Sequence, residues 1–184
     1  MRIFIGLPIN EELTCFLARR LTPWKRKFRS HIVWVKPENY HFTLKFLGEA
    51  KTHQVEELKQ QLKEKIKFFP FQLSINGVGF FVNKGAVRVI WLGVREMASF
   101  QDYFQQIESL CAKLGFLEES RPYHPHLTLG RVKSFWPNDP WLEFKQELNN
   151  CSWPILQLNK ITLWQSQLHP SGAIYRPILE INSL

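Results

Sequence analysis

Two short segments of the chain share one pattern, His-x-Thr-Leu, at positions 85 residues apart. The first is His41-Phe42-Thr43-Leu44 and the second is His126-Leu127-Thr128-Leu129. Each lies in a stretch that is typical of a β-strand, where side chains alternate between faces, so the histidine and the threonine of each segment share one face. The sequence therefore offers an imidazole beside a hydroxyl twice, each time over an apolar base.

Two imidazoles can serve as a general base and a general acid, because histidine titrates near neutral pH. Such a pair can hydrolyse a phosphodiester without a metal ion. Thr43 and Thr128 can donate hydrogen bonds to the non-bridging phosphate oxygens, and Arg131 can add a positive charge. Strict alternation puts Arg131 on the opposite face from His126, so either its long side chain or a β-bulge at Gly130 must bring it round.

Three further residues are candidates for contact with a substrate. His124 shares a face with His126 and would either touch the substrate or position His126. Tyr123 or Phe4 would stack on a base if the substrate is single-stranded RNA, with core packing as the favoured alternative for Phe4.

A zinc site is the rival interpretation of the histidines, since His41, His124 and His126 would supply three imidazoles. The sequence has no metal-ligand pattern on a helix and no acidic cluster near the motifs, and a zinc site would leave the threonines unexplained. We therefore expect no metal and no other cofactor.

The elements around the two motifs repeat in the same order, which predicts an internal duplication with a period near 85 residues. Strand, helix and motif strand at 3–7, 10–21 and 41–44 match those at 87–94, 100–114 and 126–129. Packing of the copies about a pseudo-two-fold axis would bring the motif strands together at the centre. We expect an α+β fold in which residues 1–184 form a single bilobal domain, with antiparallel sheets lining a cleft and helices outside.

Local signals predict where several elements begin and end. Asn10 is expected to cap the first helix and Thr52 the second, while Pro23 should end or bend the first. Residues 71–81 read as one strand interrupted at two glycines, Gly77 and Gly79, and followed by a hairpin turn at 83–85.

Composition limits the class of protein. The net charge of +8 favours an anionic partner, nucleic acid first, and no apolar run is long enough to span a bilayer. The first residues read as a strand rather than a signal peptide, and the three cysteines form no C-x-x-C pair. We expect a cytoplasmic protein with buried free thiols, monomeric and without an obligate protein partner.

The motifs resemble those of the two-histidine (2H) phosphoesterase superfamily, whose signature is a pair of H-x-T-x segments. Within it, the chain is most similar to the bacterial RNA 2′,3′-cyclic phosphodiesterases, also called 2′-5′ RNA ligase or LigT-like proteins. Four phrases spread along the whole chain carry the resemblance: RIFIGLP at 2–8, ENYHFTLKFLGE at 38–49, VIWLG at 89–93 and RPYHPHLTLGR at 121–131.

The resemblance implies a bilobal LigT-like fold and metal-independent hydrolysis of an RNA terminal 2′,3′-cyclic phosphate to a 2′-phosphomonoester. On that pattern His41 is the proton donor to the 3′ oxygen and His126 is the proton acceptor from water, while Thr43, Thr128 and Arg131 hold the phosphate. Some members also catalyse a reversible 2′-5′ ligation of RNA. Judged from the residues alone, the two histidines look equivalent.

Two other functions remain open from the sequence. One is a non-catalytic RNA-binding module, which the basic charge and the aromatic residues suit. The other is a phosphodiesterase that acts on small cyclic nucleotides rather than on RNA.

Overall fold

The computed structural model describes residues 1–95, 97–169 and 172–184, which form ten strands, four α-helices and one 3₁₀ helix. The strands are β1 (Arg2–Pro8), β2 (His31–Trp34), β3 (His41–Glu49), β4 (Phe71–Leu73), β5 (Ile75–Asn83), β6 (Ala86–Val94), β7 (His126–Ser134), β8 (Leu156–Leu158), β9 (Lys160–Gln167) and β10 (Ile174–Asn182). The helices are α1 (Glu11–Lys27), α2 (Thr52–Lys65), α3 (Ala98–Lys113) and α4 (Trp141–Asn149), with the 3₁₀ helix η1 at Pro37–Asn39. Within the described ranges, no helix is long and apolar enough to cross a membrane.

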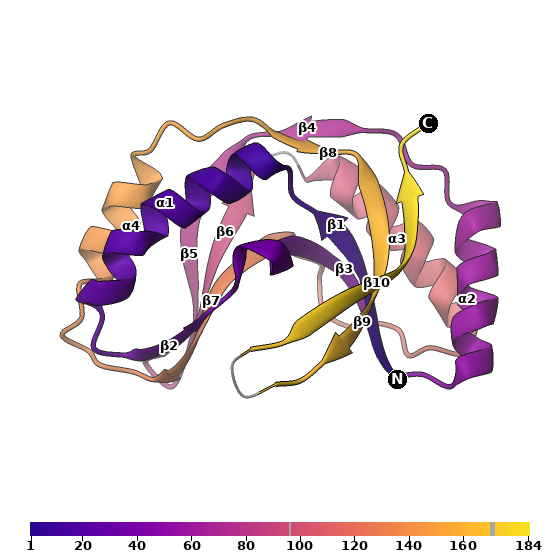
Figure 1. The fold of residues 1–184 in the computed structure, drawn as a ribbon, viewed down its shortest axis with the longest axis horizontal. Coiled ribbons are helices and arrows are strands. Elements are labelled where there is room, and N and C mark those ends of the chain that lie inside the picture. The colour runs from indigo at the N-terminus through magenta and orange to yellow at the C-terminus, as the bar shows by residue number, and fades with distance from the viewer. Residues whose placement is uncertain (96, 170–171) are drawn as a thin grey trace.

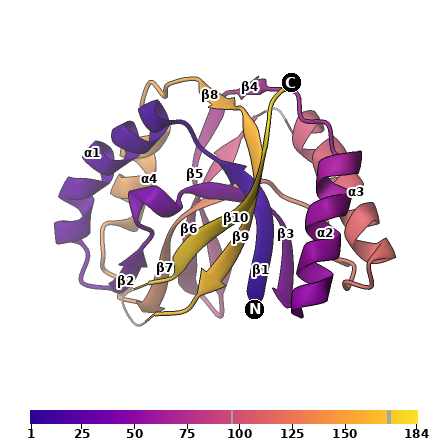
Figure 2. The same ribbon diagram turned by 45° about the vertical axis from the view of Figure 1, so that its right-hand side comes forward.

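One antiparallel sheet organises the molecule, in the order β10-β9-β1-β3-β7-β6-β5, and β2 also pairs with β7. Its two halves meet in the middle at a single residue pair, Phe42 of β3 opposite Leu127 of β7. Helices α1 and α4 lie at one end of this sheet and α2 and α3 at the other (Figures 1 and 2). The predicted α+β architecture of duplicated halves with outer helices is confirmed, and both motif strands lie at the centre.

The apolar faces of the helices build the core on the side of the sheet away from the motif side chains. Phe42 is fully buried and its ring centroid lies 5.0 Å from that of Phe100 on α3. Trp24 of α1 packs edge-on against Phe144 of α4, with centroids 5.2 Å apart. Helix α3 therefore packs against the middle of the sheet behind the first motif, while α1 and α4 pack against each other at one end.

The sequence predicted that Pro23 either ends or bends the first helix. The helix does not end at Pro23, because α1 continues to Lys27. Proline lacks the N–H that would bond to the carbonyl of residue 19, but Pro23 is exposed and water can satisfy that oxygen. The next residue, Trp24, is completely buried and its Nε1 donates to Glu147 at 3.2 Å. Burial of the Trp24 indole stabilises the helical conformation of the residues after Pro23.

Two further boundaries differ from expectation. Thr52 is the first residue of α2 rather than its cap, and the backbone N–H of Lys51 donates to the side chain of Gln54. The predicted strand at 71–81 is divided at Ser74, since β4 pairs with β8 in a separate small sheet while β5 pairs with β6. The short strand β4 could not be separated from β5 without knowledge of this distant partner.

Other local predictions agree with the structure. The Asn10 side chain accepts a hydrogen bond from Leu13 N at the start of α1. Lys84 and Gly85 both have positive φ, 48° and 74°, as a two-residue hairpin turn requires. The three cysteines are free, but only Cys111 is buried, and Cys15 is exposed on α1, so the expected burial is wrong for Cys15.

Candidate active site

The pairing of Phe42 with Leu127 sets the geometry of the candidate site. Both side chains are fully buried, so the residues on either side of them face the opposite surface of the sheet. In an antiparallel register, each motif histidine then lies next to the threonine of the other motif. The four side chains that meet on this face are His41, Thr43, His126 and Thr128.

The main chain orients both imidazoles in the same way. Nδ1 of His41 lies 2.7 Å from the carbonyl oxygen of Asn39, and Nδ1 of His126 lies 2.8 Å from that of His124. A carbonyl only accepts, so Nδ1 carries the hydrogen in each ring and Nε2 is the atom that can gain or lose a proton. In His41 this Nε2 lies 3.1 Å from Oγ1 of Thr43.

Aromatic rings from three strands surround the imidazole of His41. Their centroids lie 4.9 to 5.4 Å from it and belong to Phe4, Trp164 and Tyr175. Burial among these rings is the main cause that lowers the pKa of His41 to about 4. The charges of His126 and Arg131 also lower this pKa, while the hydrogen bond to the Asn39 carbonyl opposes the shift.

The surroundings of His126 are different. The ring of Phe81 meets it edge-on at 5.1 Å, and Trp91 lies 6.4 Å away. Burial is again the largest cause of a lowered pKa, and the charges of Arg131 and His124 add to it. Burial therefore favours the neutral form of both imidazoles when no anion is bound.

A β-bulge after the second motif changes which side chains face the site. The register of β7 with β6 shifts between Thr128 and Gly130, so that Leu129 and Gly130 are both buried and Arg131 is exposed. A side chain at Gly130 would not fit there, because its Cβ would lie 2.9 Å from Cγ2 of Ile32. Of the two alternatives raised by the sequence, the bulge is the one that turns Arg131 to the face of the motif.

The first motif is followed by the same bulge. The register of β3 with β1 shifts between Thr43 and Lys45, both Leu44 and Lys45 are buried, and Phe46 returns to the surface with an exposed fraction of 61 %. Phe46 is therefore the structural counterpart of Arg131. The two copies present the same imidazole and hydroxyl but then differ, with an aromatic ring in one and a guanidinium in the other.

Two contacts fasten the segment before the second motif to β3. The ammonium of Lys45, which is 4 % exposed, donates to the Glu108 carboxylate on α3 and to the carbonyl of Leu117. The Tyr123 hydroxyl donates to the carbonyl oxygen of Thr43 at 3.0 Å. Since this segment also supplies the carbonyl that orients the second histidine, β3 contributes to the placement of both imidazoles.

The three candidate contact residues occupy different environments. Phe4 is only 1 % exposed and packs against His41, so the packing alternative holds and no face of the ring is open to a base. One face of Tyr123 is covered by Phe104, with centroids 4.4 Å apart and planes at 7°. The side chain of His124 is exposed, and its carbonyl is the group that contacts His126.

The alternative interpretation of the histidines, a zinc site, requires a cluster of metal-binding side chains. Among the residues that the structure describes, no group of three or more His, Cys, Asp or Glu side chains is arranged to hold a metal ion. The three histidines considered for it are His41, His124 and His126.

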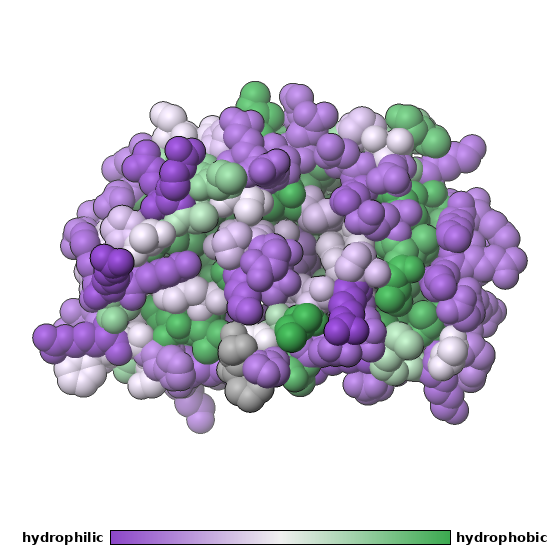
Figure 3. All heavy atoms as spheres, in the orientation of Figure 1, coloured by the Kyte–Doolittle hydropathy of each residue, from purple (hydrophilic) through white to green (hydrophobic). Residues whose placement is uncertain are grey.

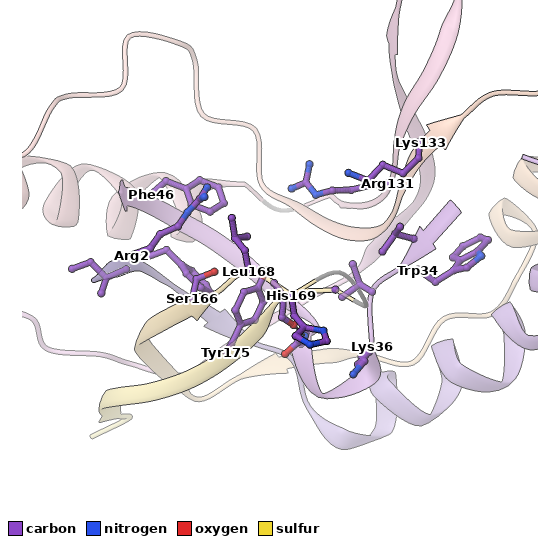
Figure 4. Close-up of a pocket in the computed structure, with 17 residues that line it drawn as sticks. Arg2, Trp34, Lys36, Phe46, Arg131, Lys133, Ser166, Leu168, His169 and Tyr175 are labelled. Atoms are coloured by element: carbon purple, nitrogen blue, oxygen red, sulfur yellow. Dashed lines mark hydrogen bonds between the residues drawn. The ribbon is translucent and has the colours of Figure 1, made fainter. Parts of the chain in front are cut away.

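One cavity is lined by motif side chains, and a second lies beside the rings that surround His41. The first, of about 690 Å³, is lined by Thr43 and His126 together with apolar side chains. The second, of about 500 Å³, is lined by Arg131, Phe46 and Tyr175 and is drawn in Figure 4. The site can therefore admit a molecule larger than a phosphate group from either side.

Sequence reasoning missed several residues that shape the site. Trp164 and Tyr175 come from β9 and β10, far along the chain from His41, and only the pairing of β9 with β1 brings them there. Lys45 was overlooked because a lysine in a strand ordinarily faces water. Phe46 follows the bulge, and alternation without a bulge would have put it on the other face.

Comparison with known proteins agrees with this geometry. The sequence model of the family described as LigT like Phosphoesterase matches the chain twice, over residues 16–91 and 92–175, and each match contains one motif. The twofold match supports the internal duplication.

Three curated relatives carry the name RNA 2′,3′-cyclic phosphodiesterase. The protein of Methanothermobacter thermautotrophicus is 33 % identical and the alignment covers 95 % of each chain. That of Methanocaldococcus jannaschii is 34 % identical over 98 % of this chain and 99 % of the relative, and that of Thermotoga maritima is 31 % identical over 98 % and 94 %. The first two organisms are archaea, so the expected closeness to bacterial proteins is only partly supported.

Solved structures share the fold. A protein of Thermus thermophilus aligns with a TM-score of 0.77 at 24 % identity, covering 99 % of this chain and 97 % of that one. LigT of Escherichia coli in its apo form aligns with a TM-score of 0.75, also at 24 % identity, covering 99 % and 96 %.

Proposed function

Because the chain belongs to the LigT-like phosphoesterase family, we propose that it is an RNA 2′,3′-cyclic phosphodiesterase that opens a terminal cyclic phosphate to a 2′-phosphomonoester. The observation that carries this proposal is the pairing of Phe42 with Leu127, which puts two imidazoles and two hydroxyls on one face. The name shared by the curated relatives supports the choice of substrate.

The proposed reaction uses the Nε2 atoms of both histidines. Nε2 of His126 takes a proton from water as its oxygen attacks phosphorus, and the bond from phosphorus to the 3′ oxygen breaks. Nε2 of His41 gives its proton to that oxygen, which leaves a 3′ hydroxyl and a 2′-phosphate. Thr43, Thr128 and Arg131 hold the non-bridging oxygens, where charge accumulates in the transition state.

The role of proton donor requires the imidazole of His41 to be protonated when substrate is bound. In the free protein, burial lowers its pKa to about 4 and favours the neutral form. The negative charge of a bound phosphate favours the charged imidazole and raises this pKa in the complex. His126, less enclosed by rings, acts as the base toward water.

The same two groups, in the same roles, would also serve 2′-5′ ligation. If a 5′ hydroxyl of RNA takes the place of water, its oxygen attacks phosphorus, the bond to the 3′ oxygen breaks, and a 2′-5′ linkage forms. The reverse reaction, cleavage of that linkage to the cyclic phosphate, exchanges the two roles by microscopic reversibility. We propose hydrolysis as the main activity because water is present at far higher concentration than RNA ends. A cytoplasmic location, where the three free thiols would stay reduced, is part of the proposal.

A single assay tests the proposed function. A short RNA that ends in a 2′,3′-cyclic phosphate is incubated with the protein in EDTA, and the position of the product phosphate is mapped. We expect a 2′-phosphate and no loss of rate on chelation. A product with a 3′-phosphate would contradict the proposed departure of the 3′ oxygen. Activity that disappears in EDTA and returns with zinc would contradict the two-imidazole mechanism. Binding without turnover would favour the non-catalytic RNA-binding module.

A further inference from the structure

We propose that the 500 Å³ cavity beside Arg131 binds the phosphodiester backbone of the RNA upstream of its terminal nucleotide. The inference rests on the proposed function and adds the direction from which the strand enters. It predicts that the enzyme prefers oligonucleotides to cyclic mononucleotides, which have no upstream phosphate.

Four cations line this cavity and come from separate parts of the sheet. Arg2 lies on β1, Lys36 follows β2, and Arg131 and Lys133 lie on β7. In Figure 4, Arg2 and Phe46 stand on one wall and Trp34 and Lys36 on the other, with the guanidinium of Arg131 extending between them. The volume lies in the range of cavities that hold a nucleotide-sized ligand.

The positive charge of the cavity is not compensated within the described part of the protein. Among the described residues that line it there is no aspartate or glutamate, and none of its four Arg and Lys side chains forms a salt bridge. Single-stranded nucleic acid binds to grooves that combine such charge with aromatic side chains, here Trp34 and Phe46. Hydrophilic side chains dominate the face of the molecule that Figure 3 presents.

The cavity adjoins the catalytic groups through shared neighbours. Phe4 and Tyr175 line it, and their ring centroids lie 4.9 and 5.4 Å from that of His41. Arg131, which also lines it, comes to the face of the second motif through the bulge in β7. A strand whose terminal phosphate lies between the histidines can therefore place its next phosphates in this cavity.

The 690 Å³ cavity on the other side has a different character. Its charges differ, because the described residues that line it include two basic side chains, Lys45 and Arg121, and two acidic ones, Glu118 and Glu119. Two of the charges that line it, Glu119 and Arg121, form a salt bridge with each other, so they do not attract an RNA backbone. The duplication thus yields a symmetric catalytic centre with chemically unequal approaches, and only the one beside Arg131 suits a polyanion.

Kinetics with two substrates test the inference. One substrate is cytidine 2′,3′-cyclic phosphate and the other is a pentanucleotide that ends in the same group. We expect Lys36→Ala and Lys133→Ala each to lower the ratio of kcat/KM for RNA to kcat/KM for the mononucleotide several-fold. Each change should also reduce the slope of log kcat/KM for RNA against log salt by about 0.7, the value for one contact with single-stranded nucleic acid. The matched control is Lys63→Ala on the exposed face of α2, which should leave the ratio at its wild-type value.

A binding measurement separates this inference from the proposed function. The affinity for a pentanucleotide with a 3′-phosphate, which has no cyclic ester to open, is measured by fluorescence anisotropy. Weaker binding by the Lys36 and Lys133 variants, but not by the Lys63 variant, supports the cavity even if hydrolysis fails. Unchanged ratios and affinities in both cavity variants would overturn the inference and leave the proposed hydrolysis intact.

Discussion

The hydrogen bond from Nδ1 to a carbonyl two residues earlier gives each motif histidine one active nitrogen. Asn39 supplies that carbonyl to His41, and His124 supplies it to His126. The arrangement needs no side-chain carboxylate to orient the imidazole, so the main chain itself fixes the tautomer. The chemistry at this scale therefore depends on the two rings, and substitutions there are the most direct test.

We expect His41→Ala and His126→Ala each to lower kcat by about two to four orders of magnitude, the usual contribution of a positioned acid or base. Both residues are only partly buried, so the variants should fold. Turnover of an RNA with a cyclic phosphate end measures the effect, and far-ultraviolet circular dichroism checks the fold. Full activity in either variant would exclude that histidine from the mechanism.

The pH dependence of kcat/KM follows from the lowered pKa values. The active free enzyme has one imidazole protonated and the other neutral, and this form is most abundant between the two apparent pKa values of the pair. Burial lowers both, that of His41 to about 4, so the optimum of kcat/KM should lie below pH 6.5. A rate profile over pH 4 to 9 measures it, and a flat profile between pH 5 and 8 would contradict the mechanism.

The motif residues could be predicted from the sequence because spacing within a strand decides which face a side chain takes. The rings around His41 could not, since Trp164 and Tyr175 reach it only through pairings between distant strands. The environment that changes the proton affinity of an imidazole is built by such long-range contacts, and no local pattern records them.

At the scale of elements, two features position the side chains of the site. They are the bulges in β3 and β7 and the contacts that hold the segment before the second motif, at Leu117 and Tyr123, to β3. Because β3 and β7 carry the same bulge, Phe46 and Arg131 come to the same face as the histidines. The sequence allowed a bulge at Gly130 but offered no sign of its counterpart at Lys45, where a buried charge occupies the equivalent position. The helices were predicted more reliably. The exception is the end of α1, which continues past Pro23 because Trp24 is buried.

We expect Lys45→Met to destabilise the protein by about 3 kcal/mol, because it leaves the carboxylate of Glu108 buried without its cation. Urea unfolding measures the change. The control is Lys59→Met, which removes the cation of an exposed pair on α2 and should cost less than about 1 kcal/mol. A double variant that also carries Glu108→Met should recover most of the loss, and equal effects of the two single changes would refute the role given to Lys45.

At the scale of the whole molecule, burial of two neutral imidazoles makes stability depend on pH. Both have lower pKa values in the folded than in the unfolded chain, so the unfolded chain binds more protons below pH 6.5. The free energy of unfolding should therefore fall as the pH decreases from about 6.5 toward 4. Each imidazole contributes at most about 1.4 kcal/mol per pH unit.

Urea unfolding at several pH values measures this dependence, with His41→Gln as the comparison. The variant removes one titrating group, so its stability should decrease less steeply over the same range. If the free energy of unfolding depends on pH equally steeply in the wild type and in the variant, other groups cause the acid sensitivity.

The seam at Phe42 and Leu127 also carries an evolutionary consequence. A half-length chain with one motif would supply a single motif histidine, so only a homodimer arranged about its two-fold axis would assemble an acid together with a base. Fusion of the two copies into one chain would remove the need for dimerisation and would allow the two halves to differ in sequence. Phe46 and Arg131 occupy equivalent positions after the two bulges but differ in chemistry, as a fused pair of copies allows.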